Sequence, residues 1–344
     1  MRAVLRCDAT AEIGFGHLSR CLALAEALRL CEVDSTFVGR FDPAAEHQIA
    51  VAGFSHHALM QPVNSGSADW EVLPSLVDVR TVSFFVVDSY RADEAYLESL
   101  KSFGRSVVMI DDFRSRTAYP CDVVLNFTWG AATLGYPAGP HLLLGPDFFL
   151  ARRRFAELRP LSLGRPRGTS VHNVLIAIGG SDPKGITART IGILRPRHSC
   201  LCLRVISVNE TDSSDMLTSF AVGSFVLSRQ PDLAEQLLWA DAAIAGGGLT
   251  KYESAYMGVP VAVISQNKGQ ATETRSLARA GLVFDVGLAD ECSNAAIGTA
   301  LDKFFEDGEL RKSLVHQMRG TFRPNTSFHA ARAILAEVGR KHGR

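Results

Sequence analysis

The chain has 344 residues, of which 47% are hydrophobic and 21% are charged. This length predicts about two domains, with enough apolar residues for a large core in each. The 36 basic residues balance the 36 acidic ones, so the formal net charge is zero. Neutrality argues against a general nucleic-acid binder, because affinity for phosphates depends on an excess of Lys and Arg, and it offers no basic tail for an anionic membrane.

The sequence also bears on the compartment. No apolar run approaches the roughly 18 residues that a membrane-spanning helix needs, and Arg2 and Arg6 bring charge too early for a signal peptide. The seven cysteines are an odd number and cannot all pair. Cys200 and Cys202 share one face of an expected strand, where core positions are favoured over a zinc site. We therefore expect a soluble, reduced, cytoplasmic protein.

Short apolar runs alternate with helical patterns, which is typical of βα units and a parallel sheet. In the first half, apolar residues at helical spacing predict a helix over His17–Leu30. Strands are predicted at Met1–Arg6, Val33–Val38, Phe84–Val87, Ser106–Ile110, Asp122–Asn126 and Leu142–Leu144. The segment Ala151–Ser170 is rich in Arg, Pro, Gly and Ser and predicts a linker.

The alternation restarts after this segment. Strands are predicted at Val174–Ile178, Cys200–Ile206, Ser224–Leu227, Asp241–Ala245 and Val261–Ile264. Helices are predicted at Ile186–Ile193, Lys251–Met257 and Ser327–Val338. The pattern predicts an α/β protein with two Rossmann-like domains facing a central cleft, over residues 1–155 and 156–325. The helix in 326–344 is expected to pack back on the first domain. Ligands of such sheets bind at the carboxyl ends of strands.

The segment from Glu12 to Arg20 joins the first predicted strand to the first predicted helix. Gly14 and Gly16 would let the backbone approach a ligand closely. His17 lies near the helix N-terminus, whose dipole disfavours the cationic imidazole, so a neutral His17 could accept a proton from water. Arg20 follows one turn later on the same face. A tight turn in which His17 only caps the helix fits the spacing equally well.

Acids follow two further strands. Asp88, with Tyr90 close behind it, would accept hydrogen bonds from sugar hydroxyl or amide groups, or hold His17 in orientation. An aspartate at a strand end is equally often a helix cap. Asp111 and Asp112 end the next strand, and without an evident third ligand they favour turn or cap roles over a metal site.

Glycine-rich turns follow two strands of the second half. Gly180, Ser181 and Asp182 precede a helix, where backbone amides suit a diphosphate. The turn lacks the Gly-Lys-Ser/Thr of a P-loop, which argues against ATP chemistry. A structural turn capped by Ser181 or Asp182 is the alternative.

The run Gly246-Gly247-Gly248-Leu249-Thr250-Lys251-Tyr252-Glu253 is the sharpest feature. Structural turns seldom use three glycines, because each loses much backbone entropy on folding. Gly247, Gly248 and Thr250 would contact phosphate, and Glu253 would bind two ribose hydroxyls. Asn267 and Gln270 would supply amides for a sugar or acetamido group, although a solvated polar turn explains them nearly as well.

The other histidines form no metal-ligand spacing, so no metal and no cofactor are expected. They are His47, His56, His57, His141, His172, His198, His316, His329 and His342. No Gly-x-Ser-x-Gly elbow is present, and no catalytic cysteine is identifiable.

Taken together, these segments resemble the PseG family of UDP-sugar hydrolases in pseudaminic acid biosynthesis and its relative SpsG from spore coat polysaccharide pathways. The matching strings are Arg6-Cys7-Asp8, Glu12 to Ala25, Val87-Asp88-x-Tyr90, Ile110-Asp111-Asp112, Leu144-Gly145-Pro146 with Arg152 after it, Gly179 to Lys184 and Gly248 to Pro260. Their order and spacing hold over most of the chain.

The resemblance implies a GT-B-like fold and the metal-independent removal of UDP from UDP-2,4-diacetamido-2,4,6-trideoxy-β-L-altropyranose. It makes His17 the base for a water that displaces UDP at the anomeric carbon with inversion, and it gives Glu253 to the nucleotide. The partners it implies are a UDP-sugar and enzymes of the same pathway.

Several positions depart from the family pattern. Ser89 stands where the family often has His, and Gly185 and Gly269 stand where it often has Asn. Leu249 and Lys251 replace small hydroxyl residues. The resemblance therefore supports UDP binding more strongly than it supports a particular sugar. A glycosyltransferase with the same donor site and a nucleotide-sugar-binding protein without catalysis remain alternatives.

Overall fold

The computed structural model describes residues 1–59, 69–167, 170–179, 182–206, 220–227 and 232–342. The chain forms two compact units. Unit 1 combines Met1–Arg153 with Arg323–Arg344, and unit 2 is Arg154–Phe322. Unit 1 is therefore assembled from two separate stretches of chain.

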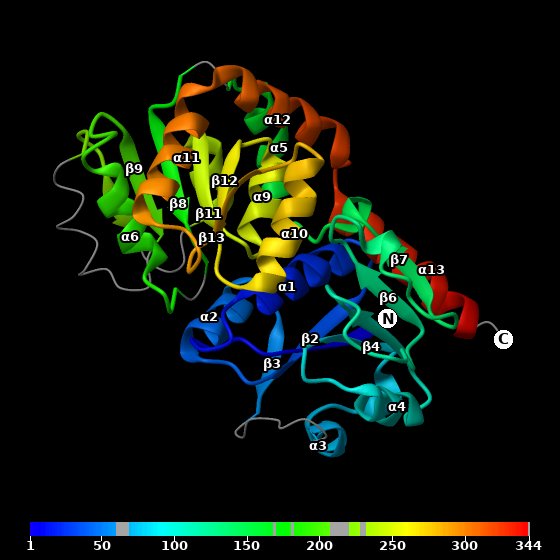
Figure 1. Cartoon of the computed structure of the whole chain (residues 1–344). Helices are drawn as coiled ribbons and strands as arrows, with labels where there is room; N and C mark the ends of the chain where they lie inside the picture. The colour runs from blue at the N-terminus through cyan, green and yellow to red at the C-terminus, as the bar shows by residue number, and fades with distance from the viewer. Residues whose placement is uncertain (60–68, 168–169, 180–181, 207–219, 228–231, 343–344) are drawn as a thin grey trace. The chain divides into compact units, whose positions relative to one another are not determined.

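Unit 1 is built on a seven-stranded sheet in the order β3-β2-β1-β4-β5-β6-β7, and every pairing is parallel (Figure 1). The strands are β1 (Arg2–Cys7), β2 (Asp34–Gly39), β3 (Ser55–Ala58), β4 (Phe84–Asp88), β5 (Ser106–Ile110), β6 (Val123–Asn126) and β7 (His141–Leu144). All residues of β4 are buried, as expected of a parallel strand covered on both faces. Cys7 pairs with Asp88, so β1 and β4 end level with each other.

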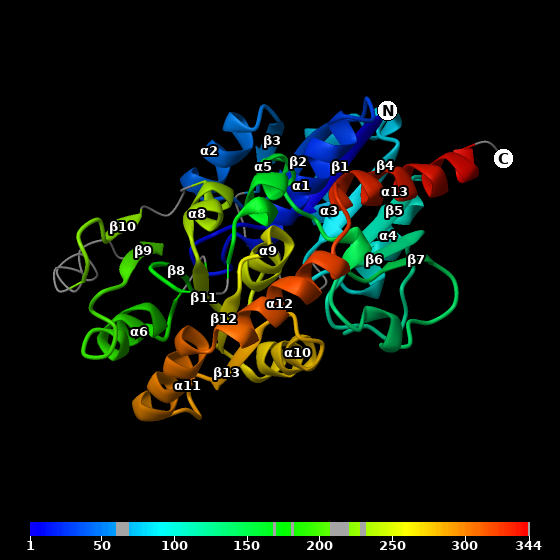
Figure 2. The same ribbon diagram turned by 90° about the horizontal axis from the view of Figure 1, so that it is seen from above.

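Helices cover both faces of this sheet. They are α1 (Gly16–Arg29), α2 (Pro43–Val51), α3 (Asp69–Leu76), α4 (Glu94–Ser102) and α13 (Thr326–His342), with short 3-10 turns η1 (Val79–Thr81), η2 (Ala131–Thr133) and η3 (Pro146–Phe148). Leu97 and Leu100 of α4 pack with Phe85 and Val87 in one apolar cluster. The late helix α13, red in Figure 2, packs against α1 and η3 and also contacts β5 and β7.

Unit 2 is built on a six-stranded parallel sheet in the order β10-β9-β8-β11-β12-β13. The strands are β8 (Asn173–Ala177), β9 (Cys202–Ile206), β10 (Phe225–Leu227), β11 (Ala242–Gly246), β12 (Val261–Ser265) and β13 (Phe284–Leu288). The helices are α5 (Arg153–Gly164), α6 (Ile186–Leu194), α8 (Leu233–Trp239), α9 (Thr250–Met257), α10 (Lys268–Arg279), α11 (Asn294–Glu306) and α12 (Gly308–Thr321). The predicted α/β class with two Rossmann-like domains is confirmed.

The predicted linker at Ala151–Ser170 is wrong over most of its length, because α5 occupies it. Phe155 and Leu158 are buried, and Arg159 donates to the carbonyl of Tyr256 at 2.7 Å. Pro160 lies inside the helix, where it removes one backbone hydrogen bond. The buried side chains offset that loss and stabilise the helix. The Pro and Gly content of the segment, taken alone, predicted a linker instead.

The cysteine prediction is also wrong in part. Cys200 is exposed and precedes β9, which begins only at Cys202, and Cys202 is partly exposed. None of the helices within the described ranges is long and apolar enough to cross a membrane.

Candidate functional site

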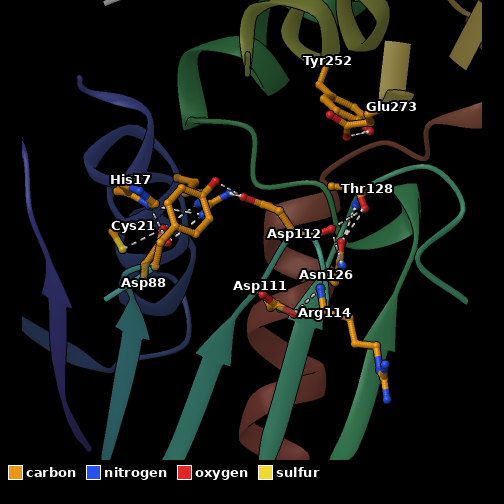
Figure 3. Close-up of polar contacts among 12 residues, drawn as sticks. His17, Cys21, Asp88, Asp111, Asp112, Arg114, Asn126, Thr128, Tyr252 and Glu273 are labelled. Carbon is orange, nitrogen blue, oxygen red and sulfur yellow. Dashed lines mark hydrogen bonds and ion pairs between the residues drawn. The ribbon is translucent and has the colours of Figure 1, made fainter. Parts of the chain in front are cut away.

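His17 and Asp88 form a hydrogen-bonded pair at the carboxyl end of the unit 1 sheet (Figure 3). His17 is the second residue of α1, and Asp88 is the last of β4. The Nδ1 atom of His17 lies 2.7 Å from Oδ1 of the fully buried Asp88. An ionised carboxylate can only accept, so the imidazole donates from Nδ1 and its Nε2 carries the lone pair. Nε2 has no partner among the described residues, so the pair has the geometry of an oriented general base.

Arg20 joins Asp88 to a second carboxylate. Its guanidinium donates to both oxygens of Asp88, at 2.5 and 2.7 Å, and to both oxygens of Asp112, at 2.7 and 2.9 Å. Burial alone would raise the pKa of Asp88, but the charge of Arg20 and the hydrogen bond from His17 outweigh it and lower that pKa to about 2. Burial opposes the charge of Arg20 as well, yet the two carboxylates raise its pKa well above the ordinary value. Asp88 is therefore ionised throughout the neutral range.

Tyr90 lies beside this network. Its hydroxyl donates to Asp112 at 2.5 Å, and its ring meets the His17 ring edge-on, with centroids 4.8 Å apart. Loss of solvent around the hydroxyl and the neighbouring Asp112 raise the pKa of Tyr90, although the residue as a whole is 55% exposed, so its phenol stays protonated. Asp112 thus belongs to the network around His17, whereas the sequence pattern favoured a turn or cap role for it. Its place directly after β5, next to β4 in the sheet, was the signal that could have found it.

Its neighbour Asp111 is turned to a different set of groups. The carboxylate accepts hydrogen bonds from the hydroxyls of Tyr119 and Tyr136, at 2.7 and 2.6 Å, and from the backbone of Arg114. Asp111 is buried, and these contacts hold the loops after β5 and β6. The two adjacent acids therefore differ in their partners: Asp112 binds Arg20 and Tyr90, and Asp111 holds the two loops.

The remaining predicted residues of unit 1 lie around the start of α1. Gly14 has a left-handed φ of 85° and donates to the carbonyl of Thr10 at 2.8 Å, closing the turn before the helix. A Cβ on Gly16 would meet nothing within 4 Å, so the first residue of α1 is open. Arg152 pairs with Glu26 of α1 at 2.9 Å and not with His17.

In unit 2, the three glycines of the β11–α9 turn differ from one another. A Cβ on Gly246 would lie 2.0 Å from the carbonyl oxygen of Ile178, and one on Gly247 would lie 2.5 Å from Cβ of Gln270. A Cβ on the exposed Gly248 would meet nothing within 4 Å. Close packing thus explains Gly246 and Gly247, while Gly248 leaves its backbone accessible at the beginning of α9.

Glu253, the acidic residue in the first turn of α9, is buried. Glu253 lies in the first turn of α9 and is 6% exposed, whereas Thr250, the first residue of the helix, is partly exposed. The helix has no side-chain cap, because Leu249 stands at the N-cap. Its first amides are therefore available to a ligand.

Three other predicted residues serve local structure. Asp182 caps α6 by accepting from the amides of Ile186 and Thr187, at 2.9 and 2.7 Å. Asn267 caps α10 by accepting from the amide of Gln270 at 3.0 Å. In the same turn, the side chain of Gln270 accepts from the backbone amide of Gln266 at 2.9 Å. Gly180 and Ser181 lie outside the described residues.

One departure from the family pattern has a backbone explanation. Gly185 has φ 62° and stands at the N-cap of α6. Glycine and asparagine are the residues that adopt this left-handed conformation most readily. An exchange of Asn for Gly at this position therefore preserves the turn.

Among the described residues, no group of three or more His, Cys, Asp or Glu is placed to hold a metal ion.

No protein-family model matches the chain. The chain is 22% identical over 329 residues to the spore coat polysaccharide biosynthesis protein SpsG of Bacillus subtilis, covering 89% of this chain and 90% of SpsG. It is 23% identical over 282 residues to the uncharacterized protein MJ1062 of Methanocaldococcus jannaschii, covering 78% of this chain. The match spans only 57% of the length of MJ1062. Sequence similarity to SpsG is therefore distant but extends over nearly the whole length of both chains.

Solved structures give a clearer likeness. MurG of Acinetobacter baumannii superposes with a TM-score of 0.66 at 15% identity, covering 98% of this chain and all of MurG. The calicheamicin glycosyltransferase CalG4 gives 0.62 at 15% identity, with 99% of each chain covered. The spinosyn rhamnosyltransferase SpnG, solved with thymidine diphosphate, gives 0.63 at 14% identity and covers 97% of this chain and all of SpnG. The fold is GT-B-like.

Proposed function

We propose that the chain is an enzyme that hydrolyses a UDP-linked sugar, with His17 as the general base. The observation that carries this proposal is the bond of 2.7 Å between His17 and the buried Asp88, which leaves Nε2 as an acceptor. A base of this kind suits the activation of water. The GT-B-like fold and the distant similarity to SpsG support a substrate from glycan biosynthesis.

In the proposed reaction, a water oxygen attacks the anomeric carbon and gives one proton to Nε2 of His17. The bond between that carbon and the diphosphate oxygen breaks, and UDP leaves with the electron pair. Attack on the face opposite the leaving group inverts the anomeric carbon. Asp88 stabilises the imidazolium that forms, as a carboxylate does beside a catalytic histidine. Tyr90, with its hydroxyl held by Asp112, would position the sugar together with Arg20 and Asp88.

The nucleotide is assigned to unit 2. Gly247, Gly248 and Thr250 would hold the diphosphate through backbone amides and a hydroxyl, and the helix terminus would stabilise its growing charge. Glu253 would bind the ribose. The proposed nucleotide site also includes Gly180, Ser181, Asp182, Asn267 and Gln270. The last three would contribute by fixing the turns in which they lie.

The sugar is proposed to be a diacetamido-trideoxy hexose of pseudaminic type, or another deoxy sugar, and the reaction is proposed to need no metal. This assignment rests on the family resemblance of the unit 1 motifs, and the cytoplasm is the compartment that it suggests.

A glycosyltransferase is the second candidate, and the fold favours it, because MurG, CalG4 and SpnG superpose over nearly the whole chain. An acceptor hydroxyl would then replace water at His17. A nucleotide-sugar-binding protein without catalysis would bind the same donor and leave it intact.

One experiment separates these functions. Purified protein is incubated with candidate UDP-sugars, with and without chelator, and released UDP and free sugar are measured in the absence of an acceptor. Release that persists in chelator and is abolished in His17→Ala supports hydrolysis. Release only after addition of an acceptor supports transfer instead, and binding without release under both conditions supports the third function.

A further inference from the structure

A buried charged cluster lies behind the β11–α9 turn. Lys251 is 1% exposed, and its ammonium donates to Glu273 of α10 at 2.8 Å. The same carboxylate accepts from the hydroxyl of Tyr252 at 2.6 Å (Figure 3). A buried ammonium is costly unless it is paired and hydrogen-bonded. The cluster thus meets the condition under which a charged lysine can remain inside unit 2.

The third contact of this lysine is with the glycine turn itself. The ammonium of Lys251 also donates to the backbone carbonyl of Gly247. No cis peptide bond is present in the described chain, so the C=O of Gly247 and the N–H of Gly248 lie in one peptide plane and point in opposite directions. A carbonyl held toward the buried ammonium therefore turns the Gly248 amide the other way.

The residue that carries this amide is accessible. Gly248 is exposed, and a Cβ built on it would meet nothing within 4 Å. Its N–H has no hydrogen-bond partner in the parts of the chain that the structure describes. Gln270 of α10 packs against Gly247, and Glu273 of the same helix pairs with Lys251, so α10 supports this turn at two residues.

We propose that Lys251 and Glu273 are positioning residues, which orient the Gly247–Gly248 peptide so that its amide donates to the diphosphate of the nucleotide. Lys251 acts through the backbone and does not touch the ligand, since its ammonium is enclosed by Gly247 and Glu273. The inference rests on the proposed function only in taking a nucleoside diphosphate as the ligand, and it requires no turnover.

The test is the affinity of the whole protein for UDP, measured by calorimetry, in wild type and in Lys251→Met. Methionine keeps much of the apolar stem and removes the charge and the bond to Gly247. We expect UDP to bind at least tenfold more weakly to Lys251→Met, while Lys251→Arg, which keeps the donors, recovers part of the loss. Uridine lacks the diphosphate, so it should bind wild type and variant with the same affinity. A general distortion of unit 2 would instead weaken the binding of both uridine and UDP.

Asp241→Asn is the matched control. Asp241 lies just before β11, at its opposite end, and accepts from Arg165 at 2.9 Å. Its loss perturbs the same strand from the other side and should change the UDP affinity by less than twofold. If Lys251→Met does not fold, Glu273→Gln replaces it, since glutamine has the shape of glutamate and can still form hydrogen bonds. This variant should also bind UDP more weakly than wild type.

Equal UDP affinity in wild type and variant overturns the inference and leaves the proposed function standing. The inference is also overturned if uridine and UDP lose affinity equally. Tight UDP binding by a wild-type protein that hydrolyses no UDP-sugar would contradict the proposed function and leave the positioning role intact. A wild type that binds no UDP overturns both.

Discussion

Arg20 contacts both carboxylate oxygens of Asp88, with Nε 2.5 Å from Oδ2 and Nη2 2.7 Å from Oδ1. Such a two-point contact fixes the plane of the carboxylate as well as its position. The same Oδ1 lies 2.7 Å from Nδ1 of His17, so the orientation of the imidazole is set by an arginine one turn along α1.

Asp88→Asn should impair catalysis through the imidazole. An amide can donate to Nδ1, which favours the tautomer with its proton on Nε2 and removes the base. We expect kcat for UDP release to fall by about 100-fold or more. Asp111→Asn is the matched control, because this buried aspartate binds Tyr119 and Tyr136 instead, and its kcat should stay near that of wild type. Equal losses in the two variants would contradict the role given to Asp88.

The lowered pKa of Asp88 links the stability of unit 1 to acid. Its pKa falls from 3.8 to about 2 on folding, a difference that corresponds to about 2 kcal/mol. Because the pKa is lowered, this stabilisation is complete above about pH 4, and it is lost as the pH falls through about 2. Urea unfolding of wild type and Asp88→Asn between pH 6 and about 2 measures it. Their free energies of unfolding should converge in acid, and parallel curves would count against the prediction.

Arg20→Met should destabilise unit 1 strongly, because it leaves the buried Asp88 and Asp112 without their shared cation. Removing one partner of a buried charge pair costs about 3–5 kcal/mol. Arg152→Met is the control in the same unit, since Arg152 is one-third exposed and pairs with Glu26, and exposed pairs contribute about 1 kcal/mol or less. Denaturant unfolding of both variants checks the order, and a smaller loss for Arg20→Met would be the contrary result.

Two neighbouring glycines of unit 2 should respond differently to alanine. Gly247→Ala places a methyl group 2.5 Å from Cβ of Gln270, so it should lower the melting temperature. Gly248→Ala meets no atom within 4 Å and should leave the melting temperature nearly unchanged while weakening UDP binding. Thermal unfolding and calorimetry on the two variants give both quantities. Unchanged UDP affinity in Gly248→Ala would show that this residue does not approach the ligand.

Most strands could be predicted because runs such as Phe84–Val87 are apolar without interruption, which is typical of strands buried on both faces. The helix α5 could not, because its burial depends on contacts such as that between Arg159 and the distant Tyr256. Local composition, with Pro160 inside the segment, indicated a linker instead. Non-local contacts are invisible to a reading of neighbours along the chain.

The same limit applies to the candidate site. His17 could be singled out by its place between a glycine turn and a helix. The sequence could not show which of three roles Asp88 has: binding the sugar, orienting His17 or capping a helix. Asp112 was missed because the spacing cannot show that Arg20 spans two strand ends. Lys251 was noticed only as a departure from a family pattern, since its role depends on Glu273 of a later helix.

The discontinuity of unit 1 has a consequence for how the protein is made. Helix α13 packs on α1, the helix that carries His17, yet it is translated only after the whole of unit 2. During synthesis, the stretch from β1 to β7 must leave the ribosome with one flank of α1 uncovered until about 170 further residues have followed. Unit 2, by contrast, is continuous and can close on itself at once. The nascent chain therefore completes unit 2 before unit 1.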